Sequence, residues 1–259
     1  MTEDPLHAFV SRSLRAEVSD VRSEVIAKDA RRELERIRFR QDGGERTLIL
    51  QRVPADEALE TQLLPFLARK TDRVPAVRSR GIPPPTVPAW PWVLVEDVVD
   101  APSGCERDPR DIVRAKVAVE QAVGSDVPAL RALGVPALAP ADLMARVPKQ
   151  AGRTIEAGAR GAAAALGALP IVLAHGDLVC ANARDTERGV VLIEWRRAHL
   201  GCGLLDVARL VSDLRARGER TKTEELFELY GQLSGQRFDS EAVRAAEVVD
   251  EAIHAATAY

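Results

Sequence analysis

One short segment of the chain places a carboxylate and an amide at a spacing that suits group transfer. The segment HGDLVCAN, residues 175–182, contains Asp177 and, five positions later, Asn182. In phosphoryl-transfer loops of this spacing, the Asp accepts the proton of the attacking hydroxyl and the Asn amide oxygen binds Mg²⁺. A D-x4-N pair is also common in plain turns, where Asp and Asn bond to their own backbone. The neighbouring sequence has to decide between the catalytic interpretation and the plain turn.

The residues on both sides of this segment favour the catalytic interpretation. The apolar run 169–174 precedes it, and the β-rich run 190–193 follows Asn182 across a polar turn. Short apolar runs bounded by turn residues are typical of buried strands. The second run ends at Glu194, whose carboxylate could be a second metal ligand.

The elements that must position this segment begin with a predicted antiparallel sheet. Residues 33–40 and 46–53 read as strands, and the D-G-G turn at 42–44 between them is a hairpin signal. A helix with leucines at helical spacing follows over 56–67, and 92–96 reads as another strand. Two further expectations are a short amphipathic helix within 6–20 and a proline-rich loop at 74–91 around a short strand near 76–78.

The remainder of the chain is predicted to be mainly helical. A β-rich first third followed by helices indicates an α+β fold with segregated layers. We expect the boundary near residue 97, with residues 1–97 and 98–259 as the two parts. The expected helices cover 111–123, 127–133, 154–166, 204–211 and 224–233.

Composition excludes several classes of protein. The 259 residues are 29% charged with a formal net charge of −3, which gives no electrostatic case for a nucleic-acid partner. The apolar run 161–174 contains Pro170 and is too short to span a bilayer, and the first residues show no secretion signal. Three cysteines without a C-x-x-C pair fit a reducing compartment. We therefore expect a cytoplasmic protein that acts away from membranes.

Other catalytic motifs are missing from the sequence. It contains no G-x4-G-K-[ST] loop, no G-x-G-x-x-G, no H-E-x-x-H and no G-x-S-x-G. A zinc site formed by His175, Cys180, His199 and Cys202 is conceivable, but recognised structural sites pair their ligands more closely than H-x4-C. The simpler interpretation of both cysteines is that they are small buried apolar residues.

Taken together, these motifs resemble the aminoglycoside phosphotransferase and choline kinase-like family, a small-molecule branch of the protein-kinase-like fold. The family pattern H-G-D-x4-N matches residues 175–182, its I-D-W motif matches 193–195, and its Gly-rich turn leading to D-x-A matches 201–208. A looser resemblance extends over residues 20–215. It implies a two-lobed fold with a small antiparallel β-rich N-lobe and a larger helical C-lobe.

The resemblance also implies roles in the C-lobe. Asp177 would be the general base or would position the acceptor hydroxyl, and Asn182 and Glu194 would bind magnesium. His175 would be structural, and Asp206 would brace the catalytic loop through hydrogen bonds.

In the N-lobe, the resemblance implies a nucleotide site. Backbone groups of Glu96 and Asp97 would face the adenine edge. Glu60 lies on the helix that resembles the αC helix, whose acid pairs with a phosphate-binding Lys of the neighbouring strand. The best-matching position on that strand holds Gln51, which is neutral.

Three departures from the family pattern concern the phosphate side of the cleft. The metal-binding acid is Glu194 in place of Asp, and the strand has Gln51 in place of Lys. The first hairpin loop, residues 27–32, has no glycine, so its backbone cannot approach phosphates as freely. Cations that could substitute are Lys28, Arg31 and Arg32 of this loop and Arg52, although strand alternation points Arg52 away from the Gln51 face.

We therefore expect a phosphotransferase that uses ATP, or another nucleoside triphosphate, and Mg²⁺ to phosphorylate a hydroxyl of a small molecule. The acceptor could be an aminoglycoside or another aminosugar, because the C-terminal helices are rich in acids that could receive a cation. The alternative hypothesis is a degenerate kinase-like protein that binds nucleotide or a partner with little transfer, favoured by Gln51, Glu194 and the glycine-free loop. The acids of the C-terminal helices that could receive a cationic acceptor are Glu219, Glu224, Glu225, Glu228, Asp239 and Glu241.

Overall fold

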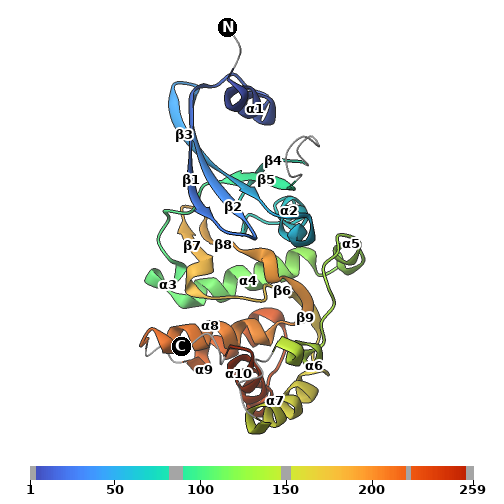
Figure 1. Cartoon of the computed structure of the whole chain (residues 1–259). Coiled ribbons are helices and arrows are strands. Elements are labelled where there is room, and N and C mark those ends of the chain that lie inside the picture. Colours follow the sequence, from blue (N-terminus) through green and yellow to red (C-terminus); the bar gives the residue numbers. More distant parts are fainter. Residues whose placement is uncertain (1–3, 82–89, 147–152, 220–222, 255–259) are drawn as a thin grey trace. The chain divides into compact units, whose positions relative to one another are not determined.

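The computed structural model describes residues 4–81, 90–146, 153–219 and 223–254. The chain divides into two compact units, Met1–Asp100 and Ala101–Tyr259, which are described separately below (Figure 1). Part of the proline-rich loop expected at 74–91 lies outside the described residues.

The first unit is built on a five-stranded antiparallel sheet. Its strands are β1 (Ser19–Lys28), β2 (Glu33–Gln41), β3 (Gly44–Arg52), β4 (Val77–Gly81) and β5 (Trp92–Glu96). They are ordered β1-β2-β3-β5-β4, so each hydrogen-bonds its neighbour in an antiparallel ladder (Figure 1). The β2–β3 hairpin turns on Asp42 and Gly43, both with positive φ (51° and 78°), between the paired residues Gln41 and Gly44. A two-residue turn with both φ values positive matches the natural twist of paired strands.

The two faces of this sheet carry different side chains, because successive residues of a strand point to opposite faces. One face forms an apolar core in which Ile37, Leu48, Leu50 and Leu94 pack with helix α1 (Pro5–Leu14). The other face carries the polar residues of β2 and β3 that matter for the site. Helix α2 (Leu59–Leu67) follows a short 3-10 helix at Ala55–Glu57, and its first turn contains the buried Glu60.

The second unit is mainly helical. Two small antiparallel sheets lie within it: β6 (Ile171–Ala174) pairs with β9 (His199–Cys202), and β7 (Ala183–Thr186) pairs with β8 (Gly189–Leu192). Helices α8 and α10 pack against each other, as do α7 and α10 (Figure 1). Its helices are α3 (Gly104–Arg107), α4 (Pro109–Val123), α5 (Val127–Ala132), α6 (Pro140–Leu143), α7 (Arg153–Leu166), α8 (Leu204–Ala216), α9 (Thr223–Ser234) and α10 (Ser240–His254).

The observed architecture confirms the α+β class and the two-part organisation of β-rich and helical portions. The sequence does not predict strands β7 and β9, because each has only four residues and shows no clear apolar alternation. No helix in the described part of the chain is both long and apolar enough to cross a membrane.

Candidate active site

The segment that holds Asp177 and Asn182 connects β6 to β7. Residues Cys180–Asn182 form a short 3-10 helix, and the Asn182 side chain turns back so that its Nδ2 donates to the Asp177 carbonyl oxygen (2.9 Å). The Ile193 N–H donates to the Asn182 carbonyl oxygen (2.9 Å), which ties the end of the loop to the strand that leads to Glu194. The loop therefore brings Asp177, Asn182 and Glu194 together within one local structure. We refer to residues 175–182 as the catalytic loop.

Gly176 is required by the shape of the catalytic loop. Its φ is +81°, and a Cβ atom added there would lie 2.2 Å from the carbonyl oxygen of Arg197. A residue with a side chain would therefore be strained in its backbone and would also collide with the neighbouring chain. The glycine of the HGD motif is explained by this close approach.

Asp206 holds the start of the catalytic loop from the first turn of α8. Its Oδ2 accepts a hydrogen bond from the His175 N–H (2.7 Å), and its Oδ1 accepts one from the Gly176 N–H (2.8 Å). Both carboxylate oxygens are thus used on backbone groups immediately before Asp177. Hydrogen bonds from N–H groups to a charged acceptor are stronger than neutral ones, so this contact orients the loop.

His175 is buried and neutral. Burial lowers the pKa of its ring below the ordinary value, although the nearby Asp206 acts in the opposite direction. We assign the ring proton to Nε2, which donates to the Ile193 carbonyl oxygen (2.8 Å), because Nδ1 then accepts from the Asp177 N–H (3.4 Å). The ring also packs on Trp195, with centroids 4.6 Å apart. Its contacts suit a structural role in fixing the loop.

A buried cation lies behind Asp206. The side chain of Lys116 on α4 is only 2% exposed and contacts Glu120 on the same helix, the ring of Tyr230 and, at 3.6 Å, Asp206 Oδ2. Burial opposes its charge, but the negative groups around it outweigh this effect and raise the pKa of Lys116 above its ordinary value. Lys116 therefore stays protonated and is the cation shared by the two buried carboxylates, one of which braces the catalytic loop.

The Asp177 carboxylate has a cationic partner on α8. Arg209 Nε donates to Asp177 Oδ1 at 3.1 Å, and both side chains are about one quarter exposed. Arg209 follows Asp206 by three residues, so one face of α8 contacts the loop at two points. Among the described residues no other group pairs with the Asp177 carboxylate, which leaves Oδ2 able to accept a hydroxyl proton.

Asn182 and Glu194 supply two oxygen ligands of the kind that Mg²⁺ prefers. With Nδ2 of Asn182 engaged on the loop backbone, its Oδ1 is the atom left for a metal. Glu194 has a left-handed backbone (φ 66°, ψ 51°), an uncommon and strained conformation for a residue with a long side chain. Its Oε2 accepts from Arg196 Nε at 3.0 Å, so a metal would have to share this carboxylate with a guanidinium. The described residues contain no group of three His, Cys, Asp or Glu side chains able to hold a metal, so further ligands would have to come from phosphates and water.

In the first unit, Gln51 lies next to Glu60. Gln51 Nε2 donates to Glu60 Oε2 at 2.6 Å, and the two residues are only 6% and 2% exposed. The expected position for a phosphate-binding Lys therefore contacts the expected acid of the neighbouring helix, but through a neutral amide. This contact keeps a strand-to-helix link and removes the positive charge that a Lys would bring.

Several solved phosphotransferases share this arrangement of elements. Spectinomycin phosphotransferase, solved with ADP and spectinomycin, is 8% identical, covers 98% of this chain and 87% of its own, and has a TM-score of 0.64. An aminoglycoside-3'-phosphotransferase of type VIII is 19% identical over 96% of this chain and 99% of its own, with a TM-score of 0.55. Choline kinase from Cryptosporidium parvum Iowa II is 12% identical over 90% and 80%, with a TM-score of 0.60. The chain has the aminoglycoside phosphotransferase fold. No family model and no curated protein matches the sequence.

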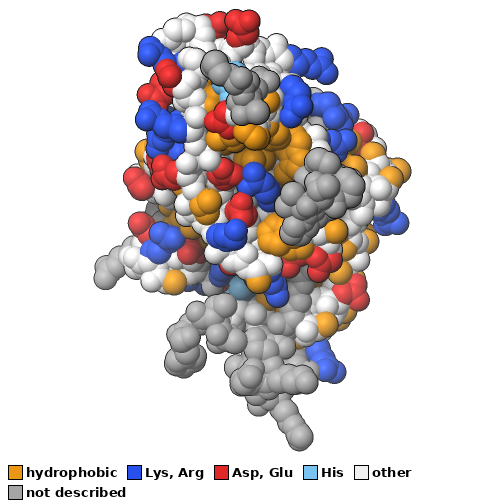
Figure 2. All heavy atoms as spheres, turned by 45° about the horizontal axis from the view of Figure 1, so that its top comes forward, with side chains coloured by type: hydrophobic (Ala, Val, Ile, Leu, Met, Phe, Trp, Pro, Cys, Tyr) orange, Lys and Arg blue, Asp and Glu red, His pale blue; other side chains and the backbone are white. Residues whose placement is uncertain are grey.

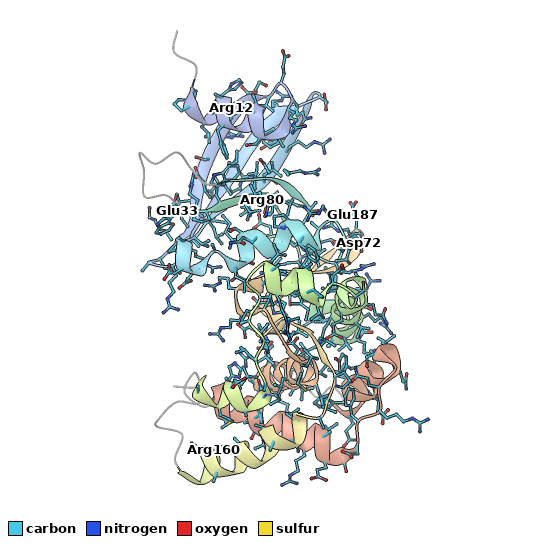
Figure 3. The ribbon with its side chains drawn as sticks, turned by 90° about the vertical axis from the view of Figure 1, so that its right-hand side faces the viewer. Arg12, Glu33, Asp72, Arg80, Arg160 and Glu187 are labelled. Carbon is cyan, nitrogen blue, oxygen red and sulfur yellow. A yellow bond between two sulfur atoms is a disulfide. The ribbon has the colours of Figure 1, made fainter. Side chains whose placement is uncertain are left out.

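Within this phosphotransferase fold, the cations expected to replace the missing Lys are paired with acids. Lys28 forms an ion pair with Glu33. Glu33, labelled in Figure 3, is the first residue of β2. Arg52 Nη1 contacts both Glu33 (2.7 Å) and Glu35 (2.6 Å). Glu33 and Glu35 lie on the face of the sheet opposite Gln51. Arg52, which contacts both, therefore lies on that opposite face, as strand alternation predicts.

The two arginines of the glycine-free loop are also engaged. Arg31 Nε lies 3.4 Å from Glu57 Oε1, and the backbone N–H groups of Arg31 and Arg32 both donate to Asp29 Oδ1 (2.7 and 2.9 Å). This Asx-type turn shapes the loop without glycine. Contact of the Arg31 side chain with phosphate would have to compete with Glu57.

The predicted hinge residues have structural contacts of their own. The Glu96 N–H donates to the Ala76 carbonyl oxygen (2.8 Å), so this donor is already used within the sheet. The Asp97 carboxylate is buried and accepts from Arg36 Nε at 2.6 Å, and Arg36 also contacts Asp100 (2.9 Å). Arg36 on β2 shares the sheet face of Gln51 and is a cation that the sequence motifs did not single out.

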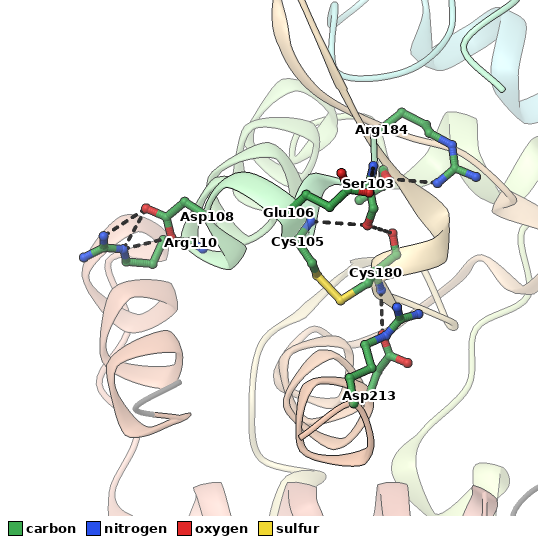
Figure 4. Close-up of a disulfide and its surroundings, with 10 residues drawn as sticks. Ser103, Cys105, Glu106, Asp108, Arg110, Cys180, Arg184 and Asp213 are labelled. Atoms are coloured by element: carbon green, nitrogen blue, oxygen red, sulfur yellow. Dashed lines mark hydrogen bonds and ion pairs between the residues drawn. A yellow bond between two sulfur atoms is a disulfide. The ribbon is translucent and has the colours of Figure 1, made fainter. Parts of the chain in front are cut away.

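The zinc alternative has no geometric support. Cys180 forms a disulfide with Cys105, with Cα atoms 5.4 Å apart (Figure 4). Cys202 is a buried free thiol. The interpretation of Cys180 as a simple buried apolar residue is therefore wrong, and that of Cys202 is consistent with its burial.

The disulfide fastens the catalytic loop to the start of the helical unit. Around it, Ser103 Oγ donates to the Cys180 carbonyl oxygen (3.0 Å) and the Cys180 N–H donates to Asp213 Oδ2 (2.8 Å) (Figure 4). The Asp185 N–H donates to the Pro102 carbonyl oxygen (2.8 Å), so the same segment holds the strand after the loop. Cys180, one end of this covalent bond, lies between Asp177 and Asn182 in the sequence, so the bond restrains both residues.

Loss of this disulfide is expected to destabilise the helical unit. Replacing Cys105 and Cys180 together with Ser should lower the free energy of unfolding by about 2–4 kcal/mol, because the cross-link restricts the unfolded chain. Dithiothreitol should lower the melting temperature of the wild type towards that of the double variant and should leave the double variant unchanged. A Cys202→Ala variant is the control, since it should keep the dithiothreitol effect; a wild type insensitive to dithiothreitol would contradict the pairing.

Three charged residues described above were not identified from the sequence: Lys116 and Arg209 in the helical unit, and Arg36 in the first unit. Two of them carried a usable signal. Lys116 and Glu120 stand four apart in an otherwise apolar stretch of helix, and Arg209 lies on the helical face of Asp206. Arg36 could not be found in this way, because its partner Asp97 lies 61 residues away in the chain.

Proposed function

We propose that the protein is a phosphotransferase that uses ATP, or another nucleoside triphosphate, with Mg²⁺ to phosphorylate a hydroxyl of a small molecule. The observation that carries this proposal is the catalytic loop, in which Asp177 is oriented through Asp206 and His175 and keeps one carboxylate oxygen unpaired among the described residues. The fold, common to phosphotransferases that act on different small molecules, supports the class of reaction and leaves the substrate open.

Asp177 would act on the acceptor hydroxyl. The hydroxyl oxygen would form the new bond to the γ-phosphorus while the bond from that phosphorus to the nucleoside diphosphate breaks, and the hydroxyl proton would pass to Asp177. Arg209 would hold Asp177 Oδ1 and keep Oδ2 directed to the hydroxyl. Positioning and charge stabilisation would supply most of the rate enhancement.

Asn182 and Glu194 would hold the magnesium ion, whose bound form neutralises phosphate charge during transfer. The hinge backbone at Glu96 and Asp97 and the Gln51 face of the sheet would hold the nucleotide. Lys28, Arg31 and Arg52 would contact phosphate only by exchanging their acidic partners, and Arg32 is a fourth candidate for phosphate contact.

Nucleotide binding and phosphate transfer test this proposal separately. The melting temperature should rise with ATP and with ADP, more so with Mg²⁺ than without, because a ligand that binds only the folded state stabilises it. Transfer from radiolabelled ATP to aminosugars, choline-like compounds and neutral sugars should then identify acceptors. Absence of any nucleotide effect would contradict the proposal.

A degenerate kinase-like protein is the second candidate function. It is favoured by one observation, the neutral Gln51–Glu60 contact in the place of a cation. Nucleotide binding without transfer, unaffected by Asp177→Asn, would support this alternative.

A Gln51→Lys variant should strengthen nucleotide binding. Lys at this buried position would pair with Glu60 and add the missing positive charge, so the Kd for Mg·ATP measured by calorimetry should fall about tenfold, equivalent to about 1.4 kcal/mol. Thr47→Lys, on the same face of β3, is the control for added charge elsewhere. Equal effects of the two substitutions would show that Gln51 is not at a phosphate-binding position.

The proposed partners are a small hydroxyl acceptor and a nucleotide, without nucleic acid. On the face drawn in Figure 2, the coloured basic and acidic side chains are interspersed, as the net charge of −3 suggests. A cytoplasmic location is proposed as well. Because disulfides rarely persist in reducing compartments, the oxidation state of Cys105 and Cys180 in the cell tests it.

A further inference from the structure

A cavity of about 330 Å³ adjoins the catalytic loop within the helical unit. Gly176, the residue before Asp177, lines it, and so does Arg209, whose Nε contacts the Asp177 carboxylate at 3.1 Å. Helices α8 and α10 form much of its wall. A hydroxyl compound held in this cavity would lie beside the group proposed to accept its proton.

Asp250 of α10 gives this cavity an unused acceptor. The residue is only 3% exposed, and its Oδ1 lies 3.0 Å from His254 Nδ1. Its Oδ2 is buried and has no hydrogen-bond partner among the residues that the structure describes. A buried carboxylate oxygen without a donor is costly, so a ligand hydroxyl that donates to it would recover this free energy.

The other charges at this cavity are mainly cationic. Arg197 is exposed and has no side-chain partner among the described residues, and Arg209 contributes a second guanidinium. Asp206 also lines the cavity, but backbone N–H groups occupy both of its oxygens. A ligand in this cavity would therefore meet two guanidinium groups. The carboxylate oxygen still able to accept a hydrogen bond from it is Oδ2 of Asp250.

The acids expected to receive a cationic acceptor lie elsewhere in the unit. Glu224, Glu228, Asp239 and Glu241 line a separate cavity of about 1130 Å³, which shares no lining residue with the cavity beside the catalytic loop. That cavity also contains Glu247 and three arginines, so its five acids are only partly offset by positive charge.

We propose that the acceptor is an uncharged polyhydroxylated molecule about the size of one sugar ring, and that polycationic aminosugars are disfavoured. Hydroxyl groups can both donate to Asp250 Oδ2 and accept from Arg197 and Arg209, whereas ammonium groups only donate. Leu205 and Ile253 offer apolar surface to the C–H face of a ring. Several ammonium groups would meet the two guanidinium groups at close range, which lowers affinity. This inference rests on the proposed phosphotransferase function.

Direct sugar binding tests the inference without relying on catalysis. Saturation-transfer NMR should show D-glucose, D-ribose or myo-inositol binding the full chain about tenfold more tightly than glucosamine or kanamycin. Asp250→Asn should weaken binding of the neutral compound about tenfold, because it removes a charged hydrogen-bond acceptor. Glu241→Gln, also on α10 but lining the separate cavity, should leave this binding unchanged.

A second variant covers the case in which Asp250→Asn fails to fold. Arg197 is exposed, and Arg197→Glu should shift the preference about tenfold towards glucosamine over glucose by reversing the charge. The inference is overturned if glucosamine or kanamycin binds more tightly than every neutral compound, if no neutral compound binds, or if both variants bind as the wild type does. Failure of the proposed function is seen separately, as the absence of a nucleotide effect on melting temperature.

Discussion

Asp177→Asn is expected to lower the rate of phosphate transfer by about 10²- to 10⁴-fold, the range for loss of a group that accepts a proton in the reaction. Asn has the same shape and can still accept from Arg209, so the loop should keep its structure. The kcat for transfer should fall, while the effect of Mg·ATP on the melting temperature should persist. Steady-state kinetics and thermal shift measure the two.

Asp185→Asn is the matched control for this experiment. Asp185 lies in β7 just after the catalytic loop, and its side chain pairs weakly with Arg107 at 3.7 Å. Its substitution removes the same charge nearby and should leave kcat within a few-fold of wild type. An Asp177→Asn enzyme as active as Asp185→Asn would refute the role given to Asp177.

Lys116→Met is expected to lower the free energy of unfolding by about 3–5 kcal/mol, since it leaves the buried carboxylates of Glu120 and Asp206 without their shared cation. Arg114→Ala removes an exposed cation from the same helix, where its partner is Asp111, and should cost less than about 1 kcal/mol. Urea unfolding followed by circular dichroism compares the two.

The double variant Lys116→Met with Glu120→Gln separates charge from packing. If uncompensated charge causes the loss, removing one of the two acids should restore part of the stability. Because Asp206 also orients the catalytic loop, the single variant should lose transfer activity under conditions where it is still folded. A single variant as stable as Arg114→Ala would contradict the account of Lys116 as a necessary counter-ion.

Much of the fold follows from local sequence patterns. The turn at Asp42 and Gly43 predicts the β2–β3 hairpin because such residues tolerate positive φ, and the observed register has this turn. Strand alternation likewise predicts opposite faces for Gln51 and Arg52. The short strands β7 and β9 escape prediction because pairing with distant partners, and not their own composition, makes them strands.

The candidate site likewise has a part that local sequence predicts and a part that depends on contacts between distant residues. The catalytic loop is contiguous, so its spacing and its glycine can be read directly from residues 175–182. The pairings of Lys116 with Asp206 and of Cys105 with Cys180 join residues far apart in the chain, and no local pattern specifies which residues meet. Prediction from one sequence therefore located the loop and Asp206, which contacts it, but missed Lys116, Arg209 and the disulfide.

The disulfide carries an evolutionary consequence. A single cysteine at position 105 or 180 would add a thiol without a bond, so neither substitution alone brings the benefit of the pair. The two positions should therefore change together, and chains descended from a common ancestor with this one should hold both cysteines or neither. A relative with only one of them would need another way to hold the loop between Asp177 and Asn182.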